Sequence, residues 1–189
     1  MTTPSSLSAT LHADALRTLE QWSARSAEQE TLRTRYVAHL RAHPDGVSRS
    51  CRPDHLTAGC LVVSGGDMAG RAVLLNLHRK ARRWFAFGGH CEAGDATLAD
   101  AALREATEES GLSGLAFDPA PVHLDEHVVT FCHPGEEVHH LDVRFRAFAP
   151  AGAVPAVSDE SLDVRWWPVD ALPSDLGEEM HALIRAACA

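Results

Sequence analysis

The spacing of hydrophobic residues divides the chain into two parts. From about residue 7 to 43, apolar side chains recur every three or four positions, which is the period of an amphipathic helix. One stripe comprises Leu11, Ala15, Leu16, Leu19 and Trp22, and a second comprises Leu32, Tyr36, Val37 and Leu40. With Ser26 as the N-cap of the second helix, these stripes predict a helical hairpin that ends in a turn at Pro44–Gly46.

After that turn, short apolar runs separated by Gly, Asp and Arg predict β-strands. The expected strands cover residues 55–63, 72–78, 84–87, 122–131, 138–148 and 164–167, and the expected helices cover 98–110 and 176–187. Residues 64–67 predict a hairpin turn between the first two strands. Because strands and helices do not alternate regularly, we expect an α+β fold with a mixed sheet. The expected organisation is an N-terminal helical extension (1–46) and one domain (47–189).

The two apolar stripes of the hairpin need a surface to pack against. The favoured interpretation is that they dock on the domain that follows, because amphipathic helices normally bury their apolar face within their own chain. The alternative is a contact with a second copy of the chain in a homodimer.

Composition excludes several classes of protein. The net charge of -9 would repel a phosphate backbone, so a nucleic acid polymer is not expected as a partner. The five cysteines form no C-x-x-C pair, which favours reduced thiols over disulfides or a zinc site. The sequence shows neither a signal-peptide pattern nor an apolar run of about 20 residues, so we expect a cytoplasmic location and no membrane partner.

The segment from Gly88 to Leu112 contains the residues that indicate a metal site. On the helix expected there, Glu105, Glu108 and Glu109 fall at i, i+3 and i+4 and share one face. Like charges this close to a helix C-terminus destabilise the helix, and a divalent cation would relieve the conflict. Oxygen ligands suit Mg²⁺ or Mn²⁺. The other interpretation is a solvated acidic helix face.

This segment resembles the Nudix box. The residues that match its pattern are Gly89, Arg104, Glu105, Glu108, Glu109, Gly111 and Leu112. The box departs from the pattern in its loop, where Asp95 replaces a glutamate and one extra residue precedes Arg104; we place that residue near Thr97, which can cap the helix. Ala106 is smaller than the usual aliphatic residue. Gly111 is expected at the C′ position of the helix.

The resemblance, which is to MutT-like pyrophosphohydrolases and a bacterial subgroup of undefined substrate, implies a Nudix α/β/α sandwich. It implies hydrolysis of a nucleoside diphosphate linked to another moiety, by water attack on phosphorus. Glu105, Glu108 and Glu109 would bind Mg²⁺ or Mn²⁺, with the Gly89 carbonyl as a further ligand. Arg104 would hold one of these glutamates in place, and Asp95 would orient the helix. The general base would be Glu108, Glu109 or one of three loop glutamates, Glu136, Glu137 and Glu160.

Residues near the box are candidates for contact with a small phosphorylated, nucleotide-type substrate. His90 follows the glycine pair, and Trp84 could stack on a base or pack in the core. Arg83 belongs to the basic run 79–83, which either attracts an anionic substrate or is a solvated loop.

The chain contains twelve histidines, and five of them cluster in sequence: His123, His127, His133, His139 and His140. A zinc site is conceivable. Their spacing is not that of a zinc motif and no cysteine joins them, so we expect them at the surface or lining a pocket.

Two other functions stay open. Some Nudix domains are ligand-sensing modules without catalysis, but these often lose box glutamates that are present here. Isopentenyl-diphosphate isomerases share the fold, but their box is more degenerate than this one.

Overall fold

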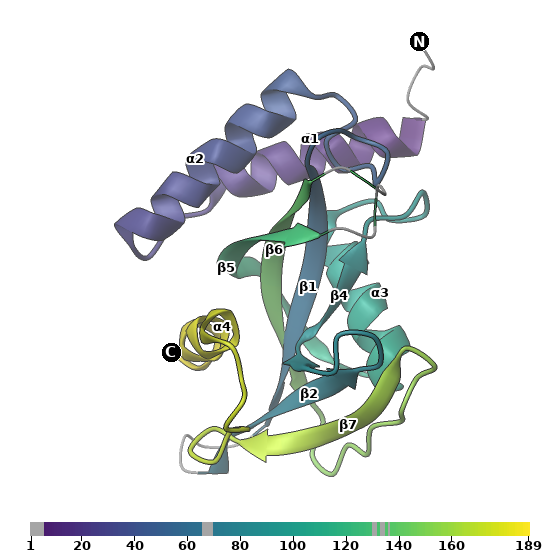
Figure 1. Cartoon of the computed structure of the whole chain (residues 1–189), viewed down its shortest axis with the longest axis vertical. Helices are drawn as coiled ribbons and strands as arrows, with labels where there is room; N and C mark the ends of the chain where they lie inside the picture. Colours follow the sequence, from purple (N-terminus) through teal and green to yellow (C-terminus); the bar gives the residue numbers. More distant parts are fainter. Residues whose placement is uncertain (1–5, 66–69, 130–131, 133–134, 136) are drawn as a thin grey trace. The chain divides into compact units, whose positions relative to one another are not determined.

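The structure of the chain is a computed structural model, shown in Figure 1, which describes residues 6–65, 70–129, 132, 135 and 137–189. Its helices are α1 (Ser6–Gln21), α2 (Ala27–Ala42), α3 (Leu98–Ser110) and α4 (Glu178–Cys188). Its strands are β1 (His55–Ser64), β2 (Ala72–His78), β3 (Trp84–Phe85), β4 (Phe87–His90), β5 (Ala116–Val129), β6 (Val138–Ala149) and β7 (Ser161–Pro168). None of the helices within the described residues has the length and apolar content that crossing a membrane requires.

The strands form one seven-stranded sheet. Its order is β3-β2-β1-β6-β5, with β4 paired to β1 and β7 paired to β2. Strand β2 is antiparallel to β1, β3 and β7, and Val73 lies opposite both Val63 and Trp167. The expected α+β fold is confirmed.

Most predicted elements agree with the structure, and the differences have physical reasons. The strand expected at 84–87 is divided between β3 and β4. Strand β5 begins at Ala116 instead of residue 122, because Pro119 and Pro121 weaken the strand pattern but are tolerated in a strand at the end of the sheet order. The predicted turn at 66–67 and the strand end at 130–131 lie outside the described residues.

The fold divides into two compact units. The first comprises Met1–Ala58, Gly89–Ala101 and Leu124–Val143, and the second comprises Gly59–Gly88, Ala102–His123 and Arg144–Ala189. Each unit is assembled from three separate stretches of the chain. The division predicted at residue 46 rests on sequence pattern alone and stays a prediction.

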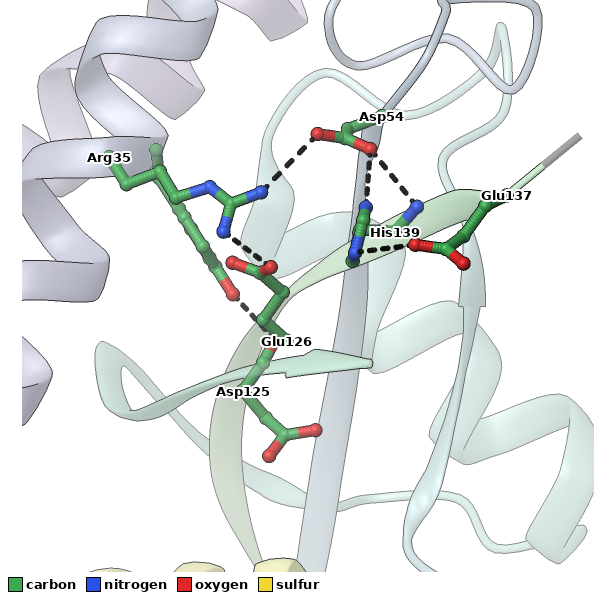
Figure 2. Close-up of polar contacts among 7 residues, drawn as sticks. Arg35, Asp54, Asp125, Glu126, Glu137 and His139 are labelled. Atoms are coloured by element: carbon green, nitrogen blue, oxygen red, sulfur yellow. Dashed lines mark hydrogen bonds and ion pairs between the residues drawn. The ribbon is translucent and has the colours of Figure 1, made fainter. Parts of the chain in front are cut away.

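In the first unit, the N-terminal helices pack against strand residues of the same unit. Gln29 of α2 exchanges hydrogen bonds with the backbone of Leu124, and Tyr36 Oη donates to the carbonyl oxygen of Asp125 at 2.5 Å. Arg35 forms ion pairs with Glu126 and Asp54, as Figure 2 shows. The buried residues of the two stripes are Leu11, Ala15, Leu19, Tyr36, Val37 and Leu40. The helical hairpin therefore docks within its own chain, and the homodimer stays a prediction.

The N-terminus of α3 receives two side-chain caps. The predicted cap is confirmed, since Thr97 Oγ1 accepts a hydrogen bond from the Asp100 N–H at 3.0 Å. A second acceptor comes from α1: Asp14 Oδ2 accepts from the Leu98 N–H at 2.9 Å, and Asp14 is buried. A carboxylate at this end of a helix interacts favourably with its dipole. Helix α1 thus helps to fix the start of the helix that carries the box glutamates.

The core of the second unit lies between α4 and residues of β1, β2 and β5. Its buried members are Leu61, Val63, Val73, Leu75, Val122, Leu176, Met180, Leu183, Ile184, Ala187 and Cys188. Trp84, Phe85 and Trp167 pack against it while remaining partly buried. This cluster buries the apolar face of α4 and supports β2 and β3.

We predict that Gly111→Ala destabilises the protein. Gly111 follows α3 with φ +67°, as the C′ position requires, and an added Cβ would lie 2.8 Å from Ala156 Cβ. The left-handed conformation alone costs about 1–2 kcal/mol for a residue with a Cβ, and this should lower Tm by about 2–8 °C in thermal melts.

Gly114→Ala is the matched control for this prediction. Gly114 has φ +71° but no atom within 4 Å of an added Cβ. Gly114→Ala should therefore show the loss of Tm that the left-handed conformation causes, without the clash. Gly111→Ala should lower Tm more than Gly114→Ala. An equal loss of Tm in the two variants would contradict the clash expected between the added Cβ and Ala156.

Candidate active site

Glu109 is the most buried carboxylate of the predicted site. Its side chain comes from the last turn of α3, and the residue is only 8% exposed. Oε2 accepts a hydrogen bond from Asn76 Nδ2 at 3.0 Å, and Oε1 accepts from the Gly88 N–H at 3.2 Å. Burial raises the pKa of Glu109 to about 8, and the negative charges of Glu105 and Glu160 act in the same direction. The two hydrogen bonds thus hold the Glu109 carboxyl group in one place, but they compensate its negative charge poorly when it is ionised.

Arg104 connects the other two glutamates of the helix. Its Nη1 donates to Glu105 at 2.9 Å and to Glu108 at 3.3 Å. Burial raises the pKa of Glu105, although the Arg104 hydrogen bond opposes the shift. Glu108 has a more exposed side chain than Glu105 (61% against 15%). The three glutamates share one face but differ in depth, with Glu109 and Glu105 inward and Glu108 at the surface.

Glu160 adds a further negative charge near this face. It is exposed, and its charge contributes to the raised pKa values of both Glu105 and Glu109. Arg79 fixes the turn around it with three hydrogen bonds: from its N–H to the Glu160 carbonyl oxygen at 2.9 Å, and from its guanidinium to the carbonyl oxygens of Asp159 and Ser161, both at 2.8 Å. Arg79 of the basic run is thus engaged in holding a carboxylate-bearing turn.

Of the other two loop glutamates, Glu137 is among the residues that the structure describes. Glu137 belongs to the first unit, where its carboxylate is 3.9 Å from His139 (Figure 2). Glu136 lies outside the described residues. Among the loop glutamates that the structure describes, Glu160 is therefore the one that shares a unit with the box glutamates.

The predicted substrate-binding residues are divided between the units, with Arg83 and Trp84 in the second and His90 in the first. Arg83 pairs with Glu179 at 3.4 Å, and Trp84 packs edge-on against Trp167 with ring centroids 5.3 Å apart. Trp84 also contacts the core of the second unit, which favours its packing role. Gly89 and His90 end β4 within the first unit, where His90 contacts other histidines. The roles of Gly89, His90, Arg83 and Trp84 stay predictions.

Asn76 was missed from the sequence. It is buried in β2, and Nδ2 also contacts the carbonyl oxygen of Ala86 at 3.4 Å while donating to Glu109. The sequence does contain a signal for Asn76, which is the single amide in the apolar run 72–77. A polar side chain buried in a strand needs a hydrogen-bond partner, so an amide at this position indicates a specific contact. Its partner could not be read from the sequence because the two residues are 33 positions apart.

The loop of the box is ordered by its carboxylate. Asp95 Oδ2 accepts a hydrogen bond from the Glu92 N–H at 2.7 Å, and the Asp95 N–H donates to the Glu92 carbonyl oxygen at 3.1 Å. Asp95 is 5% exposed. The substituted carboxylate thus closes the loop 92–95, which leads into α3.

These residues fit a divalent cation. Glu105 and Glu109 lie inside the electrostatic field of a third carboxylate, and the pKa of each is raised. A bound cation would compensate all of these charges with the hard oxygen donors that Mg²⁺ and Mn²⁺ prefer. The carboxylate set is therefore suited to such an ion.

The sequence profile of the NUDIX domain matches residues 53–187. The chain belongs to the Nudix family, and it is a Nudix hydrolase. A search of curated protein sequences found no significant match.

Solved structures share the fold at low sequence identity. A NUDIX-family hydrolase from Clostridium perfringens is 23% identical with TM-score 0.53, covering 70% of this chain and 93% of its own. A MutT Nudix hydrolase from Burkholderia pseudomallei is 20% identical with TM-score 0.50, covering 71% and 98%. A C. elegans Ap4A hydrolase is 17% identical with TM-score 0.52, covering 69% and 93%. These similarities support the fold.

Proposed function

We propose that the chain hydrolyses a pyrophosphate bond in a nucleoside diphosphate linked to another moiety, by water attack on phosphorus. The observation that carries the proposal is the pair of buried carboxylates Glu105 and Glu109 together with Glu160, whose charge adds to the rise in pKa that burial gives each of the other two. A fold rarely keeps such a set without a use, because the mutual repulsion destabilises it. In a Nudix hydrolase, this set is the natural place for the metal that the reaction needs.

In this proposal, Glu105, Glu108 and Glu109 hold Mg²⁺ or Mn²⁺. The ion, when bound, neutralises phosphate charge and lowers the pKa of water. Arg104 keeps Glu105 and Glu108 at fixed positions through charge-assisted hydrogen bonds at 2.9 and 3.3 Å. Asn76 and the Gly88 N–H orient the two oxygens of Glu109 and leave their remaining lone pairs for the ion.

Glu160 is our choice for the general base. Both oxygens of Glu109 already accept hydrogen bonds from the protein, whereas Glu160 is exposed and can accept a proton from water. The hydrogen bonds from Arg79 fix the backbone of its turn. Arg79 would therefore act as a positioning residue rather than as a contact for the substrate.

The substrate is expected to be a small nucleotide-type molecule. A C. elegans protein with this fold is an Ap4A hydrolase, which supports a nucleotide-type ligand without selecting one. The net charge of -9 favours a compact ligand whose phosphates are compensated by a metal over a nucleic acid polymer.

The experiment that tests the proposal is a turnover screen with Mg²⁺ and with Mn²⁺. It covers nucleotide sugars, dinucleoside polyphosphates, NTPs and dNTPs, with isopentenyl diphosphate as a separate substrate, and products are separated by chromatography. We expect cleavage of at least one nucleotide substrate within its phosphate chain.

Two results would contradict the proposal. Isomerisation of isopentenyl diphosphate without release of phosphate would identify an isomerase. Binding of a nucleotide that is never cleaved, with either metal present, would identify a ligand-sensing module.

A further inference from the structure

Three histidines and a cysteine converge in the first unit. The ligand atoms of His55, His90, Cys132 and His140 all lie within 4.8 Å of one another. His90 Nε2 is 3.1 Å from His55 Nε2, and Cys132 Sγ is 3.4 Å from His90 Nε2 and 3.2 Å from His140 Nε2. The three imidazole rings lie close to one another, with centroids 4.9 to 5.1 Å apart in each pair.

This arrangement differs from the one expected from the sequence. Of the five histidines expected at the surface or lining a pocket, His140 is only 7% exposed and joins this cluster, together with the fully buried His55, which was not one of the five. A cysteine does join them. His55 lies 35 positions before His90, and Cys132 lies 42 positions after it, so the spacing of a local zinc motif is absent although the side chains meet.

We propose that His55, His90, Cys132 and His140 bind one zinc ion at a structural site whose ligands are separate from the box glutamates. In tetrahedral zinc sites with Zn–N near 2.0–2.1 Å and Zn–S near 2.3 Å, ligand atoms lie about 3.3 Å (N to N) and about 3.6 Å (N to S) apart. The three separations between Nε2 and Sγ atoms given above, from 3.1 to 3.4 Å, are within about 0.4 Å of these values. Donor atoms at these separations suit the coordination sphere of a first-row transition metal.

The protonation states of the side chains agree with this geometry. Burial lowers the pKa of His90 to about 4, and burial also lowers the pKa of His140. Both imidazoles are therefore neutral at pH 7, the form that binds metal. The thiol of Cys132 would lose its proton on binding, as coordinated thiols do.

The donor set also discriminates between metals. One thiolate and three imidazoles favour zinc or another borderline transition metal, whereas Mg²⁺ and Mn²⁺ prefer oxygen donors. Zinc would thus bind to this His-Cys cluster, and Mg²⁺ or Mn²⁺ would bind to the carboxylates of α3.

The ligands come from four segments of the first unit. His55 begins β1, His90 ends β4, Cys132 lies between β5 and β6, and His140 is in β6. With four protein ligands the coordination sphere is closed, which is typical of structural zinc rather than catalytic zinc. A bound ion would cross-link these four segments, as a disulfide cross-links two segments of a chain.

The competing explanation is a hydrogen-bonded network of imidazoles and a thiol without metal. To separate the two, the full chain is stripped with a chelator and titrated with Co²⁺ in excess Mg²⁺, which occupies the carboxylates. We expect roughly one equivalent of Co²⁺ to give a thiolate charge-transfer band and the strong visible bands of four-coordinate cobalt, both removed by Zn²⁺. With Zn²⁺ at about 100 times its Kd, Tm should rise by about 5–10 °C.

Cys132→Ser should abolish the charge-transfer band and most of the rise in Tm. Cys91→Ser, which changes a half-buried cysteine outside the cluster, should leave both intact. A wild-type protein without the band, or with a Tm response to Zn²⁺ equal to that of Cys132→Ser, would overturn the zinc site. None of these measurements uses turnover, so failure of the proposed hydrolase activity would not affect them.

Discussion

Replacement of Glu109 by glutamine is expected to lower kcat about 10²–10⁴-fold. The amide has nearly the shape of the carboxylate and can still accept the Asn76 hydrogen bond with its oxygen. It carries no charge, however, and presents its NH₂ group on one side, so it compensates a divalent cation far less well.

The same variant should fold at least as well as the wild type in the absence of metal. Burial raises the pKa of Glu109 to about 8, which means that the fold favours the uncharged carboxyl. A neutral side chain therefore removes a penalty, and Tm of the metal-free variant at pH 9 should equal or exceed that of the wild type. Asp100→Asn, a change at an exposed residue of the same helix, is the control and should keep full activity. Activity of Glu109→Gln within a few-fold of the wild type would contradict the metal-site interpretation.

Removal of divalent cations is expected to abolish turnover. Chelation should reduce the rate to background, and Mg²⁺ or Mn²⁺ should restore it, because without the ion nothing neutralises the phosphate charge or lowers the pKa of the attacking water. The rate should follow a saturation curve in added metal. A chelator-treated enzyme that keeps its rate would contradict the proposal, and so would one restored by K⁺ alone.

The affinity for metal should depend on pH in a defined direction. The raised pKa of Glu109, about 8, means that metal displaces a proton near neutral pH, so the metal affinity should increase from pH 6 to pH 9. In the metal-free protein, stability from this group is present below its unfolded value of 4.5 and is lost as the pH rises through 8. Calorimetry in buffers of different ionisation enthalpy measures the released protons. Equal metal affinity at pH 6 and pH 9 would contradict the shift.

The secondary structure could be predicted because its signals are local. The period of apolar residues located α1, α2 and α4, and glycine and cap residues located the ends of α3. The box glutamates were found for the same reason, since Glu105, Glu108 and Glu109 are neighbours on one helix. The start of β5 was predicted wrongly, because its prolines obscured the first residues of this edge strand.

The remaining features depend on contacts between distant residues. Asn76 meets Glu109 because β2 and the part of α3 from Ala102 onward belong to one unit, and Asp14 caps the start of α3 from 84 positions earlier in the chain. The convergence of His55 and Cys132 likewise depends on how β1 and the segment before β6 are folded together. No periodic pattern encodes such contacts, so sequence analysis found the helix that bears the charges and its neighbouring Arg104, but not Asn76, which holds Glu109 from a distant strand.

The central claim, that water attacks phosphorus at this site, is tested most directly by turnover in water enriched in heavy oxygen. The substrate is any nucleotide that the screen identifies, and mass spectrometry locates the label in the products. The account predicts one heavy oxygen in a phosphate group of a product, with Mg²⁺ or Mn²⁺ present, and label incorporation about 10²–10⁴-fold slower when Glu109→Gln replaces the wild type. Products without label, or label on carbon, would contradict it.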